Sequence, residues 1–472
     1  MSPWLKWFQT PFQYILILEG INFMAKYFGT DGIRGEANSG LMTPVNLLKL
    51  AQSFGVTLKR RSNRPKVLLG KDTRVSGYLI EGIIASGLCS VGVDVLFVGP
   101  LPTPGIAYLT RGMRADAGIM ISASHNPYYD NGIKLFDHNG FKLPDSDESY
   151  IEQLMDSPDL EKYLVNSEYM GRAKRIDDAI GQYAVFLKER FPKNLKLDGK
   201  KIVLDCAHGA GYKVAPKVFE ELGAEVISIH NDPNGFNINL NSGALHPQIL
   251  AEKVVEYKAD IGFALDGDAD RLIVVDEKGN ILDGDHIIAM CALEMKSQNQ
   301  LKNNGVCVTI MSNKGFDVAM ENAGIHVVRT NVGDRNVMES MLSNDFYLGG
   351  EQSGHLIFLD SSTTGDAVIA CLKVLEMMCH TKKKISELTS VMKKFPQITK
   401  NVKVNRKPPL ETLHMTISLV REFENELGSS GRVLLRYSGT ESLARITLEG
   451  PELSRIEVMA SKIEQILLKE IG

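Results

Sequence analysis

The chain is organised around the stretch GIMISASHNP at residues 118–127, which is followed by NGIK at residues 131–134. The apolar residues up to Ile121 predict a buried strand. The polar residues after it favour a tight, hydrogen-bonded turn. In such a turn Ser124, with His125 beside it and Lys134 ten residues on, can act as a covalent nucleophile next to a proton-handling group. Taken alone, a Ser–His pair after a strand is more often a simple turn, so the interpretation depends on motifs elsewhere.

Length and composition are typical of a multidomain globular protein. The 472 residues exceed what one hydrophobic core holds, and the chain is 44% hydrophobic and 23% charged. The formal charge of −4 gives no reason to expect a nucleic-acid or membrane partner. The six cysteines show neither a C-x-x-C pair nor a zinc spacing, which favours the reducing cytoplasm.

Residues 1–23 differ from the rest of the chain. They contain both tryptophans, and their apolar run at residues 14–18 is too short to span a membrane. No small-residue cleavage site of a signal peptide follows this run. We therefore expect residues 1–23 to be an extension that precedes a start at Met24 and is not part of the fold.

A strand–helix–strand pattern occurs three times along the chain. In each copy a third short strand then leads directly into a polar loop, and these third strands are predicted at residues 118–121, 261–265 and 346–348. The alternation predicts three similar α/β units. Because sheets of this kind bind ligands beyond the carboxyl ends of their strands, the three loops are expected to face one shared cleft.

The last part of the chain follows another pattern. Residues 410–427 predict an amphipathic helix, followed by two strands and a terminal helix, which is typical of a small α+β domain. The predicted fold class is α/β, with three similar α/β domains and a C-terminal α+β domain around a central cleft. The expected domains are residues 24–170, 171–280, 281–394 and 395–472.

The second polar loop, DGDADR at residues 266–271, carries three alternating carboxylates. In an extended loop Asp266, Asp268 and Asp270 project to one side. At about 5 Å, each pair would repel by roughly 3 kcal/mol at an effective dielectric constant of 20. A solvated strand could spread the charges, but the runs that flank the loop are apolar. A hard divalent cation, Mg²⁺, is therefore the predicted partner.

Two further loops carry groups that bind hydroxyls and phosphates. The loop GGEQSGH at residues 349–355 offers Glu351 and Ser353 to sugar hydroxyls and His355 to hold or move a proton. The loop RYSGTE at residues 436–441, followed by Arg445, can cradle a phosphate. Each loop alone could be an ordinary turn. Together with Ser124 and the aspartates, they suit phosphoryl transfer on a phosphosugar.

These four motifs, in this order, resemble those of the α-D-phosphohexomutase superfamily from about Lys26 to the C-terminus. The resemblance implies that Ser124, and not Ser122, is phosphorylated. It also assigns roles to the other site residues: Mg²⁺ ligation by Ser124, Asp266, Asp268 and Asp270; catalysis by Ser124, Lys134, Arg34, His125 and His355; and substrate binding by Glu351, Ser353, His355, Arg436, Ser438, Gly439, Thr440, Arg445 and Arg271. The four domains would then carry the phosphoserine, the Mg²⁺, the sugar and the distal phosphate, respectively.

Two motifs favour the branch of this superfamily that acts on glucosamine phosphates. They are GTDGIRG at residues 29–35 and SGTE at residues 438–441. Ser442 stands where this branch usually has a proline, which would leave the last loop less rigid.

The resemblance implies an isomerase that interconverts glucosamine 6-phosphate and glucosamine 1-phosphate. The reaction would run through a phosphoserine enzyme and a 1,6-bisphosphate, and would supply the synthesis of UDP-N-acetylglucosamine and cell-envelope precursors. The expected cofactors are Mg²⁺ and a glucosamine or glucose 1,6-bisphosphate primer. A kinase or autophosphorylation could first activate Ser124, and the chain could form a homodimer. The alternatives are phosphomannomutase or phosphoglucomutase activity, a metal-dependent sugar phosphatase, and a non-catalytic sugar-phosphate binder.

Overall fold

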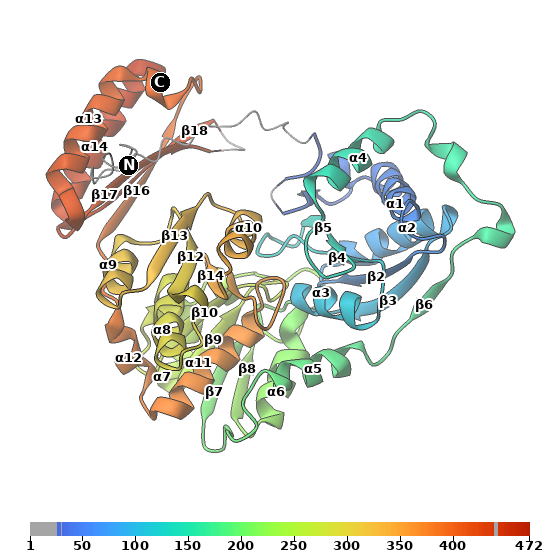
Figure 1. Cartoon of the computed structure of the whole chain (residues 1–472), viewed down its shortest axis with the longest axis horizontal. Coiled ribbons are helices and arrows are strands. Elements are labelled where there is room, and N and C mark those ends of the chain that lie inside the picture. Colours follow the sequence, from blue (N-terminus) through green and yellow to red (C-terminus); the bar gives the residue numbers. More distant parts are fainter. Residues whose placement is uncertain (1–25, 30, 439–441) are drawn as a thin grey trace, which may run out of the picture.

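The computed structural model of this chain describes residues 26–29, 31–438 and 442–472. Its sheets form four units that follow one another along the sequence, three with mixed sheets and one with a small antiparallel sheet (Figure 1). The expected fold class is thereby confirmed. The expectation for residues 1–23 falls outside the described residues.

The first unit has a six-stranded sheet in the order β1-β5-β4-β2-β3-β6. Its central strand β4 is buried along its whole length, as a continuous apolar run in a parallel sheet requires. The elements of this unit are β1 (Ile33–Glu36), α1 (Pro44–Lys59), β2 (Lys66–Lys71), α2 (Ser76–Ser90), β3 (Asp94–Pro100), α3 (Thr103–Gly112), β4 (Ala117–Ile121), β5 (Asp130–Asp137), α4 (Asp145–Met155) and β6 (Ala173–Arg175).

The second and third units repeat the central part of this arrangement, with sheet orders β11-β10-β9-β7-β8 and β13-β12-β14-β15. The second unit comprises α5 (Ala179–Glu189), β7 (Lys201–Asp205), α6 (Val214–Glu221), β8 (Glu225–Ile229), α7 (Gln248–Glu256), β9 (Ile261–Leu265), β10 (Leu272–Asp276) and β11 (Ile281–Leu282). The third comprises α8 (Gly284–Ser297), β12 (Gly305–Thr309), α9 (Lys314–Asn322), β13 (His326–Thr330), α10 (Asp334–Asn344), β14 (Leu348–Gly350), β15 (Leu356–Phe358), α11 (Ala367–Thr381) and α12 (Ile385–Leu388).

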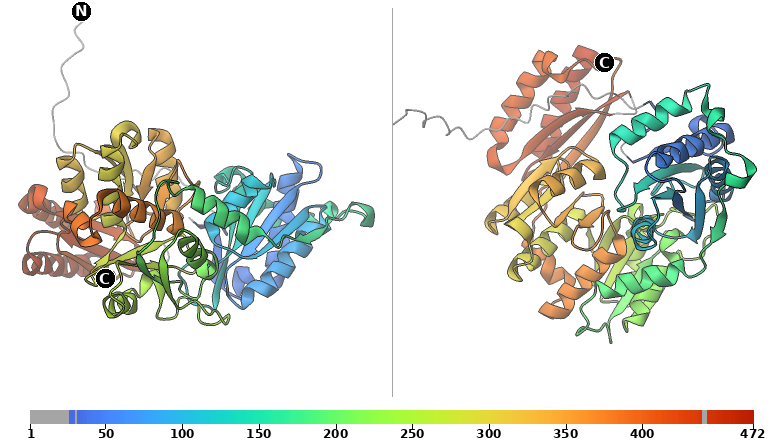
Figure 2. Two further views of the ribbon diagram at one scale, coloured as in Figure 1. Left: turned by 90° about the horizontal axis from the view of Figure 1, so that it is seen from below. Right: turned by 45° about the vertical axis from the view of Figure 1, so that its right-hand side comes forward.

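The C-terminal unit has a three-stranded antiparallel sheet in the order β16-β18-β17, with two helices on one side (Figures 1 and 2). Its elements are β16 (Gln397–Lys403), α13 (His414–Leu427), β17 (Arg432–Tyr437), β18 (Leu443–Glu449) and α14 (Leu453–Ile471). The described helices of the whole chain include none that is both long and apolar enough to cross a membrane.

Each polar loop connects a third, parallel strand to an antiparallel neighbour. The Ser124 loop (residues 122–129) joins β4 to β5, the aspartate loop (266–271) joins β9 to β10, and the Glu351 loop (351–355) joins β14 to β15. The sequence pattern predicted the parallel strands to within two residues but not these antiparallel partners. The antiparallel strands are short or fully buried, so they lack the clear period-two alternation that would have revealed them.

The sheets extend slightly beyond the expected domain boundaries. Strand β6 lies after residue 170 but pairs with β3 of the first sheet. Strand β11 lies after residue 280 but pairs with β10 of the second sheet. Both strands are very short, and short edge strands leave little signal in a sequence.

Two of the hydrophobic clusters among the described residues show which units are packed together. A single core runs from the first unit through the second into the third; it includes Leu68, Phe263 and Leu348. The C-terminal unit has its own core, which includes Val420, Ile446 and Ile463. The first three units therefore share buried apolar surface, whereas the C-terminal unit is packed as a separate body.

The C-terminal unit is tied to the third unit by a buried polar joint. Arg432 donates to the carbonyl oxygens of Ile310 and Ser312 and pairs with Glu449. The Lys314 backbone N–H donates to Glu449 Oε2 at 2.7 Å. Directional hydrogen bonds of this kind hold two bodies in register without merging their cores.

The buried Asp366 caps helix α11 and should make the stability of the fold depend on pH. It accepts hydrogen bonds from the backbone of Val368 and Ile369 and from the Tyr183 hydroxyl at 2.6 Å. Burial raises the pKa of Asp366 to about 6; Tyr183 and Cys371 are the titratable groups that face it. A carboxylate whose pKa is raised on folding stabilises the fold at low pH and loses that contribution as the pH rises through about 6.

We expect Asp366→Asn to remove this pH dependence. Between pH 5 and pH 7.5 the wild type should lose roughly 1.4 kcal/mol that the variant does not lose. The difference in Tm, variant minus wild type, should therefore be more positive at pH 7.5 than at pH 5. Asp360→Asn, at an exposed carboxylate nearby, is the control. An equal difference at both pH values would contradict the raised pKa.

Candidate active site

The three polar loops meet at the carboxyl ends of their parallel strands. Ser124 Oγ of the first loop donates to Asp266 Oδ2 of the second at 2.6 Å. Arg271 of the second loop forms an isolated β-bridge with His355 of the third. The Leu272 N–H donates to the Gly354 carbonyl at 2.9 Å. The three loops that the repeated pattern placed together therefore do meet in the structure.

Ser124 is held in an unusual backbone conformation beneath this junction. Its φ is +51°, in the left-handed region that residues with a side chain seldom adopt. The residue is 1% exposed, and its hydroxyl lies 3.4 Å from His125 Nδ1 in addition to its bond with Asp266. Its hydroxyl proton is thus directed at a carboxylate.

The aspartate loop forms a cluster that fits a divalent cation. One oxygen each of Asp266, Asp268 and Asp270 lies within 4.8 Å of the others, and all three residues are buried. Among the described residues, Asp268 Oδ1 and Asp270 Oδ1 are buried without a hydrogen-bond donor. Burial and the two neighbouring carboxylates raise the pKa of Asp266 well above its usual value. An oxygen-only ligand set with unsatisfied negative charge is what Mg²⁺ requires.

Lys134 supplies positive charge to this cluster from strand β5. Its Nζ lies 2.9 Å from Asp268, 3.1 Å from Asp270 and 3.1 Å from Asp31. Burial alone would lower the pKa of Lys134, but the three carboxylates outweigh it and hold the pKa well above its usual value. With one carboxylate for each ammonium proton, Lys134 is protonated and firmly oriented.

Arg34 reaches the Ser124 loop from strand β1. It pairs with Asp31, and its Nη1 donates to the Ala123 carbonyl at 3.4 Å, one residue before Ser124. Because β1 pairs with β5 in antiparallel register, Arg34 and Lys134 project from the same face of the sheet and share Asp31 as a partner. Arg34 reaches the Ser124 loop and Lys134 reaches the aspartate loop, and such cations suit a phosphoryl group between the two loops.

The pKa values of the two histidines of the site are shifted in opposite directions. Burial, together with Arg271 and Arg34, lowers the pKa of His125 to about 4, so its imidazole is neutral at pH 7. For His355 burial acts in the same direction, but Asp270 and Asp334 outweigh it and raise the pKa. The Gly365 N–H donates to His355 Nε2 at 3.2 Å, so the Nδ1 atom faces Asp270.

The Glu351 loop is braced by its own neighbours. Glu351 Oε1 accepts from the Gly333 N–H at 2.9 Å, and its Oε2 accepts from Ser353 Oγ at 3.1 Å. Arg271 is mostly buried beside this loop, and nearby carboxylates, chiefly Asp270, raise its pKa despite the burial. Carboxylate, hydroxyl and guanidinium groups here can all hydrogen-bond a sugar phosphate.

The C-terminal unit brings two arginines together. Arg436 and Arg445 are direct partners across strands β17 and β18 and therefore project from the same face of the sheet. Burial and Arg445 lower the pKa of Arg436. Ser438 is 5% exposed at the end of β17. Like charges directly opposite each other are unfavourable in a sheet unless an anion lies between them. The predicted Gly439 and Thr440 lie outside the described residues.

Several site residues gave no sequence signal that singled them out. Asp31 lies between Lys134, Lys142 and Arg34, and Lys142 in turn pairs with Asp334 of α10. Thr103, at the start of α3, donates its hydroxyl to Asp268. Asp31 lies within the GTDGIRG motif, but two of its three partners, Lys134 and Lys142, lie more than 100 residues along the chain.

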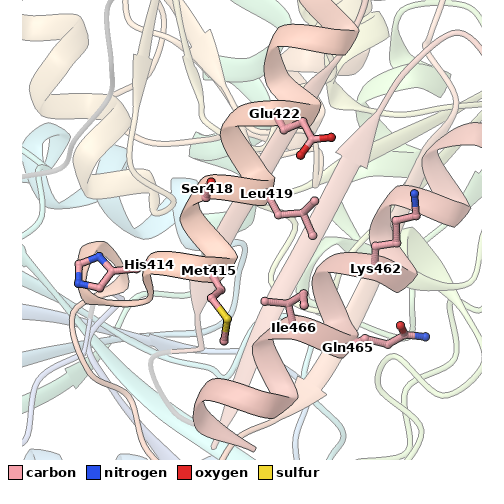
Figure 3. A pocket seen from close by; sticks show the side chains of 8 residues that line it. All are labelled: His414, Met415, Ser418, Leu419, Glu422, Lys462, Gln465 and Ile466. Atoms are coloured by element: carbon pink, nitrogen blue, oxygen red, sulfur yellow. The ribbon is translucent and has the colours of Figure 1, made fainter.

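One groove lies elsewhere, on the C-terminal unit. It has a volume of about 550 Å³ and runs between α13 and α14, as Figure 3 shows. His414 and Met415 from α13 and Lys462 and Ile466 from α14 are among its lining residues. None of the site residues described above lines this groove.

Models of one protein family match the chain along nearly its whole length. The phosphoglucomutase/phosphomannomutase alpha/beta/alpha domains I, II and III match residues 25–162, 182–279 and 283–395. The C-terminal domain of the same family matches residues 379–466. The resemblance drawn from the four motifs is thereby confirmed.

Known proteins agree with this family. Phosphoglucosamine mutase of Citrifermentans bemidjiense is 52% identical over 449 residues, which cover 95% of this chain and 99% of that protein. A phosphoglucomutase/phosphomannomutase family protein of Burkholderia thailandensis has a similar structure, with a TM-score of 0.77, 22% identity and coverage of 94% and 98% of the two chains. Aspergillus fumigatus N-acetylphosphoglucosamine mutase, solved with GlcNAc-6P and magnesium, has a TM-score of 0.63 at 18% identity and coverage of 93% and 95%. The chain therefore belongs to the phosphoglucomutase/phosphomannomutase family of isomerases and, within it, to the phosphoglucosamine mutases.

Proposed function

We propose that this protein interconverts glucosamine 6-phosphate and glucosamine 1-phosphate, with Ser124 as the carrier of the transferred phosphoryl group. The observation that carries this proposal is the contact between Ser124 Oγ and Asp266 inside the buried aspartate cluster. The identity of about half of all residues with phosphoglucosamine mutases supports the choice of glucosamine. The product would supply amino-sugar precursors of the cell envelope.

The first half-reaction transfers the phosphoryl group from phospho-Ser124 to the free hydroxyl of the sugar phosphate. The bond between phosphorus and Ser124 Oγ breaks, and a bond between phosphorus and the sugar oxygen forms. The hydroxyl proton passes to a protein group, for which Lys134 and His355 are the two candidates. Lys134 is protonated in its present contacts, so it suits the donor role toward a leaving oxygen; it can accept a proton only after giving one up.

The second half-reaction returns a phosphoryl group to Ser124. The 1,6-bisphosphate turns end for end, and its other phosphorus forms a bond with Ser124 Oγ while the bond to the sugar oxygen breaks. The serine proton is already directed at Asp266 Oδ2, which leaves an oxygen lone pair for the attack. As Ser124 gives up this proton, the departing sugar oxygen takes up one from Lys134 or His355 and becomes a hydroxyl. Arg34, at the neighbouring Ala123 carbonyl, can hold the oxygens of the transferring group.

Asp266, Asp268, Asp270 and the Ser124 oxygen are the residues that would hold Mg²⁺. When bound, this ion would neutralise negative charge on the transferring phosphoryl group. Lys134 and Asp31 complete the charge balance around these ligands.

The non-reacting phosphate would be held by the C-terminal unit. Arg436 and Arg445 share one face of its sheet, and Ser438 lies at the end of strand β17. Because this unit has its own core and a narrow polar joint, it can release and re-grip a substrate that reverses.

We place the reaction in the cytoplasm, where all six cysteines, which are free here, remain reduced. A kinase, autophosphorylation or a bisphosphate primer would load Ser124, and a homodimer is compatible with this scheme.

The decisive test is whether Ser124 carries the phosphate through each cycle. Intact-mass analysis of the purified protein should show a fraction with one phosphate, and Ser124→Ala should lack it. Enzyme stripped of phosphate should be nearly inactive until glucosamine or glucose 1,6-bisphosphate is added, and Ser124→Ala should remain inactive with that primer. Ser122→Ala distinguishes the two serines: it should still carry the phosphate, because only Ser124 faces Asp266.

Two results of this test would overturn the proposal. Stripped enzyme that turns over fully without primer would exclude a phosphoserine cycle. Inorganic phosphate released as fast as sugar 1-phosphate would instead indicate the phosphatase. Comparing kcat/KM for glucosamine, mannose and glucose 6-phosphates then decides the sugar, and equal values would place the protein with the broader mutases.

We expect Asp268→Asn to weaken Mg²⁺ binding and to lower turnover by roughly 100-fold or more, because one ligand charge is lost. Titration calorimetry with Mg²⁺ measures the first effect and steady-state kinetics the second. Asp232→Asn, at an exposed residue of the same unit, should change neither. A normal Mg²⁺ titration of Asp268→Asn would remove the aspartate cluster as the metal site.

We expect Arg436→Ala to raise KM for the phosphosugar about tenfold or more, since a charge-assisted contact with the distal phosphate is lost. Its effect on kcat should be smaller, because Arg436 does not lie at Ser124. Arg455→Ala serves as the matched control, because Arg455 is exposed on α14 of the same unit and pairs with Glu426. An unchanged KM would place the distal phosphate elsewhere.

A further inference from the structure

Arg74 directs four of its five guanidinium donors at the chain segment 124–130, which begins with Ser124. The side chain is fully buried, and its Nε donates to Asp72 Oδ2 at 2.8 Å. The four remaining N–H groups are directed at carbonyl oxygens of one loop, those of Ser124 (2.9 Å), Asn126 (2.8 Å), Pro127 and Asp130 (3.0 Å). Five donors with five bonds inside a protein core form a built structure and not an incidental contact.

The backbone N–H of Ser124 is also tied to Asp72, the partner of Arg74. The Ser124 N–H donates to Ser122 Oγ at 2.9 Å, and Ser122 Oγ donates to Asp72 Oδ2 at 2.7 Å. Asp72 also accepts from the Arg74 backbone at 3.0 Å. Both the N–H and the carbonyl of Ser124 are therefore tied to Asp72 and Arg74.

Asn239, from the second unit, holds the same loop from the opposite side. Its Nδ2 donates to the Ser124 carbonyl at 2.8 Å and to the Asn126 carbonyl at 3.0 Å, the two carbonyls that Arg74 Nη2 also binds. Asn239 is 8% exposed, and its own backbone N–H donates to the Ala207 carbonyl at 2.9 Å. Each of these two carbonyls thus receives one donor from the first unit and one from the second.

The aspartate loop packs directly on this contact. A Cβ atom on Gly267, between two of the predicted metal ligands, would lie 2.5 Å from the Ser124 carbonyl oxygen and 2.7 Å from Asn239 Nδ2. Both distances are too short for a side chain, so only glycine permits the approach. Asn239 therefore lies where the Ser124 loop and the aspartate loop touch.

We propose that Arg74 and Asn239 are positioning residues for the Ser124 nucleophile, and that Asn239 sets its place relative to the aspartate loop of the second unit. The left-handed backbone of Ser124 directs Oγ at Asp266, and the two side chains hold the peptide carbonyl that fixes this direction. Neither residue contacts Oγ, so both act through the loop. The positioning role rests on the proposed function of Ser124, whereas the clamp itself does not.

Asn239→Leu tests this role because leucine has nearly the same volume but no donor. We expect kcat to fall at least about tenfold with KM within threefold of the wild type, because the substrate contacts remain and the nucleophile is misdirected. The rate at which a hexose 1,6-bisphosphate restores phosphate to Ser124, followed by intact mass, should fall by a similar factor. Arg74→Lys should show the same split, because an ammonium has three donors and cannot span four carbonyls.

Asn231→Leu, at an exposed asparagine of the same segment, is the matched control and should keep kcat, KM and Tm. The Tm of Asn239→Leu should stay near that of the wild type. A kcat within twofold of the wild type, a rise in KM alone, or a fall in Tm large enough to unfold the protein at the assay temperature would each overturn the positioning role of Asn239.

Hydrogen–deuterium exchange separates this inference from the proposed function. Exchange of the peptide that spans residues 118–134 should rise in Asn239→Leu and not in Asn231→Leu, whether or not the protein is active. Equal exchange in both variants and the wild type would overturn the clamp. If exchange rises in Asn239→Leu but the wild-type protein has no mutase activity, the clamp is kept and the function assigned to Ser124 is overturned.

Discussion

Three buried carboxylates within 4.8 Å of one another are the constraint on which the rest of this structure depends. Negative charges this close are unfavourable out of water unless positive charge lies beside them. Lys134 from the first unit supplies part of it, and a divalent cation suits the two oxygens that the described residues leave without a donor. The charge balance of the second unit thus requires the first unit to be in place. The contacts of Lys134 with Asp268 and Asp270 therefore belong both to the interface between the two units and to the candidate site.

The layout of the cores follows from what each part of the site has to do. The loops with Ser124, the aspartates and Glu351 must stay fixed relative to one another, and the first three units share one hydrophobic core. In the proposed reaction the arginine pair of the C-terminal unit would hold the end of the substrate that does not react, and that unit has a separate core. Packed cores transmit position rigidly, whereas a joint made of a few hydrogen bonds permits rotation.

The backbone of the site loops is shaped by side chains from distant segments. Ser124 and Ala269 both have positive φ angles in the loops that meet, although neither is a glycine. Such conformations persist where the surroundings over-determine them. Around Ser124 this is achieved by Arg74 from the first unit and Asn239 from the second, and around Ala269 by the Ala367 N–H, which donates to its carbonyl at 3.1 Å.

The sequence by itself determined the parallel strands, the three-fold repetition of α/β units and the position of each polar loop, because hydrophobic periodicity and turn residues are local properties of the chain. It also identified the aspartate cluster, although the loop is a turn in which Ala269 has a positive φ and not the extended segment that was expected. Family resemblance, and not spacing, supplied the role of Arg34 and the assignment of Lys134 to catalysis. Only the tertiary structure showed Asp31, Thr103, Arg74 and Asn239 at the site, because their partners lie many residues away in the sequence. Which distant side chains meet depends on sheet register and on how the units pack, and neither can be inferred from a local sequence pattern.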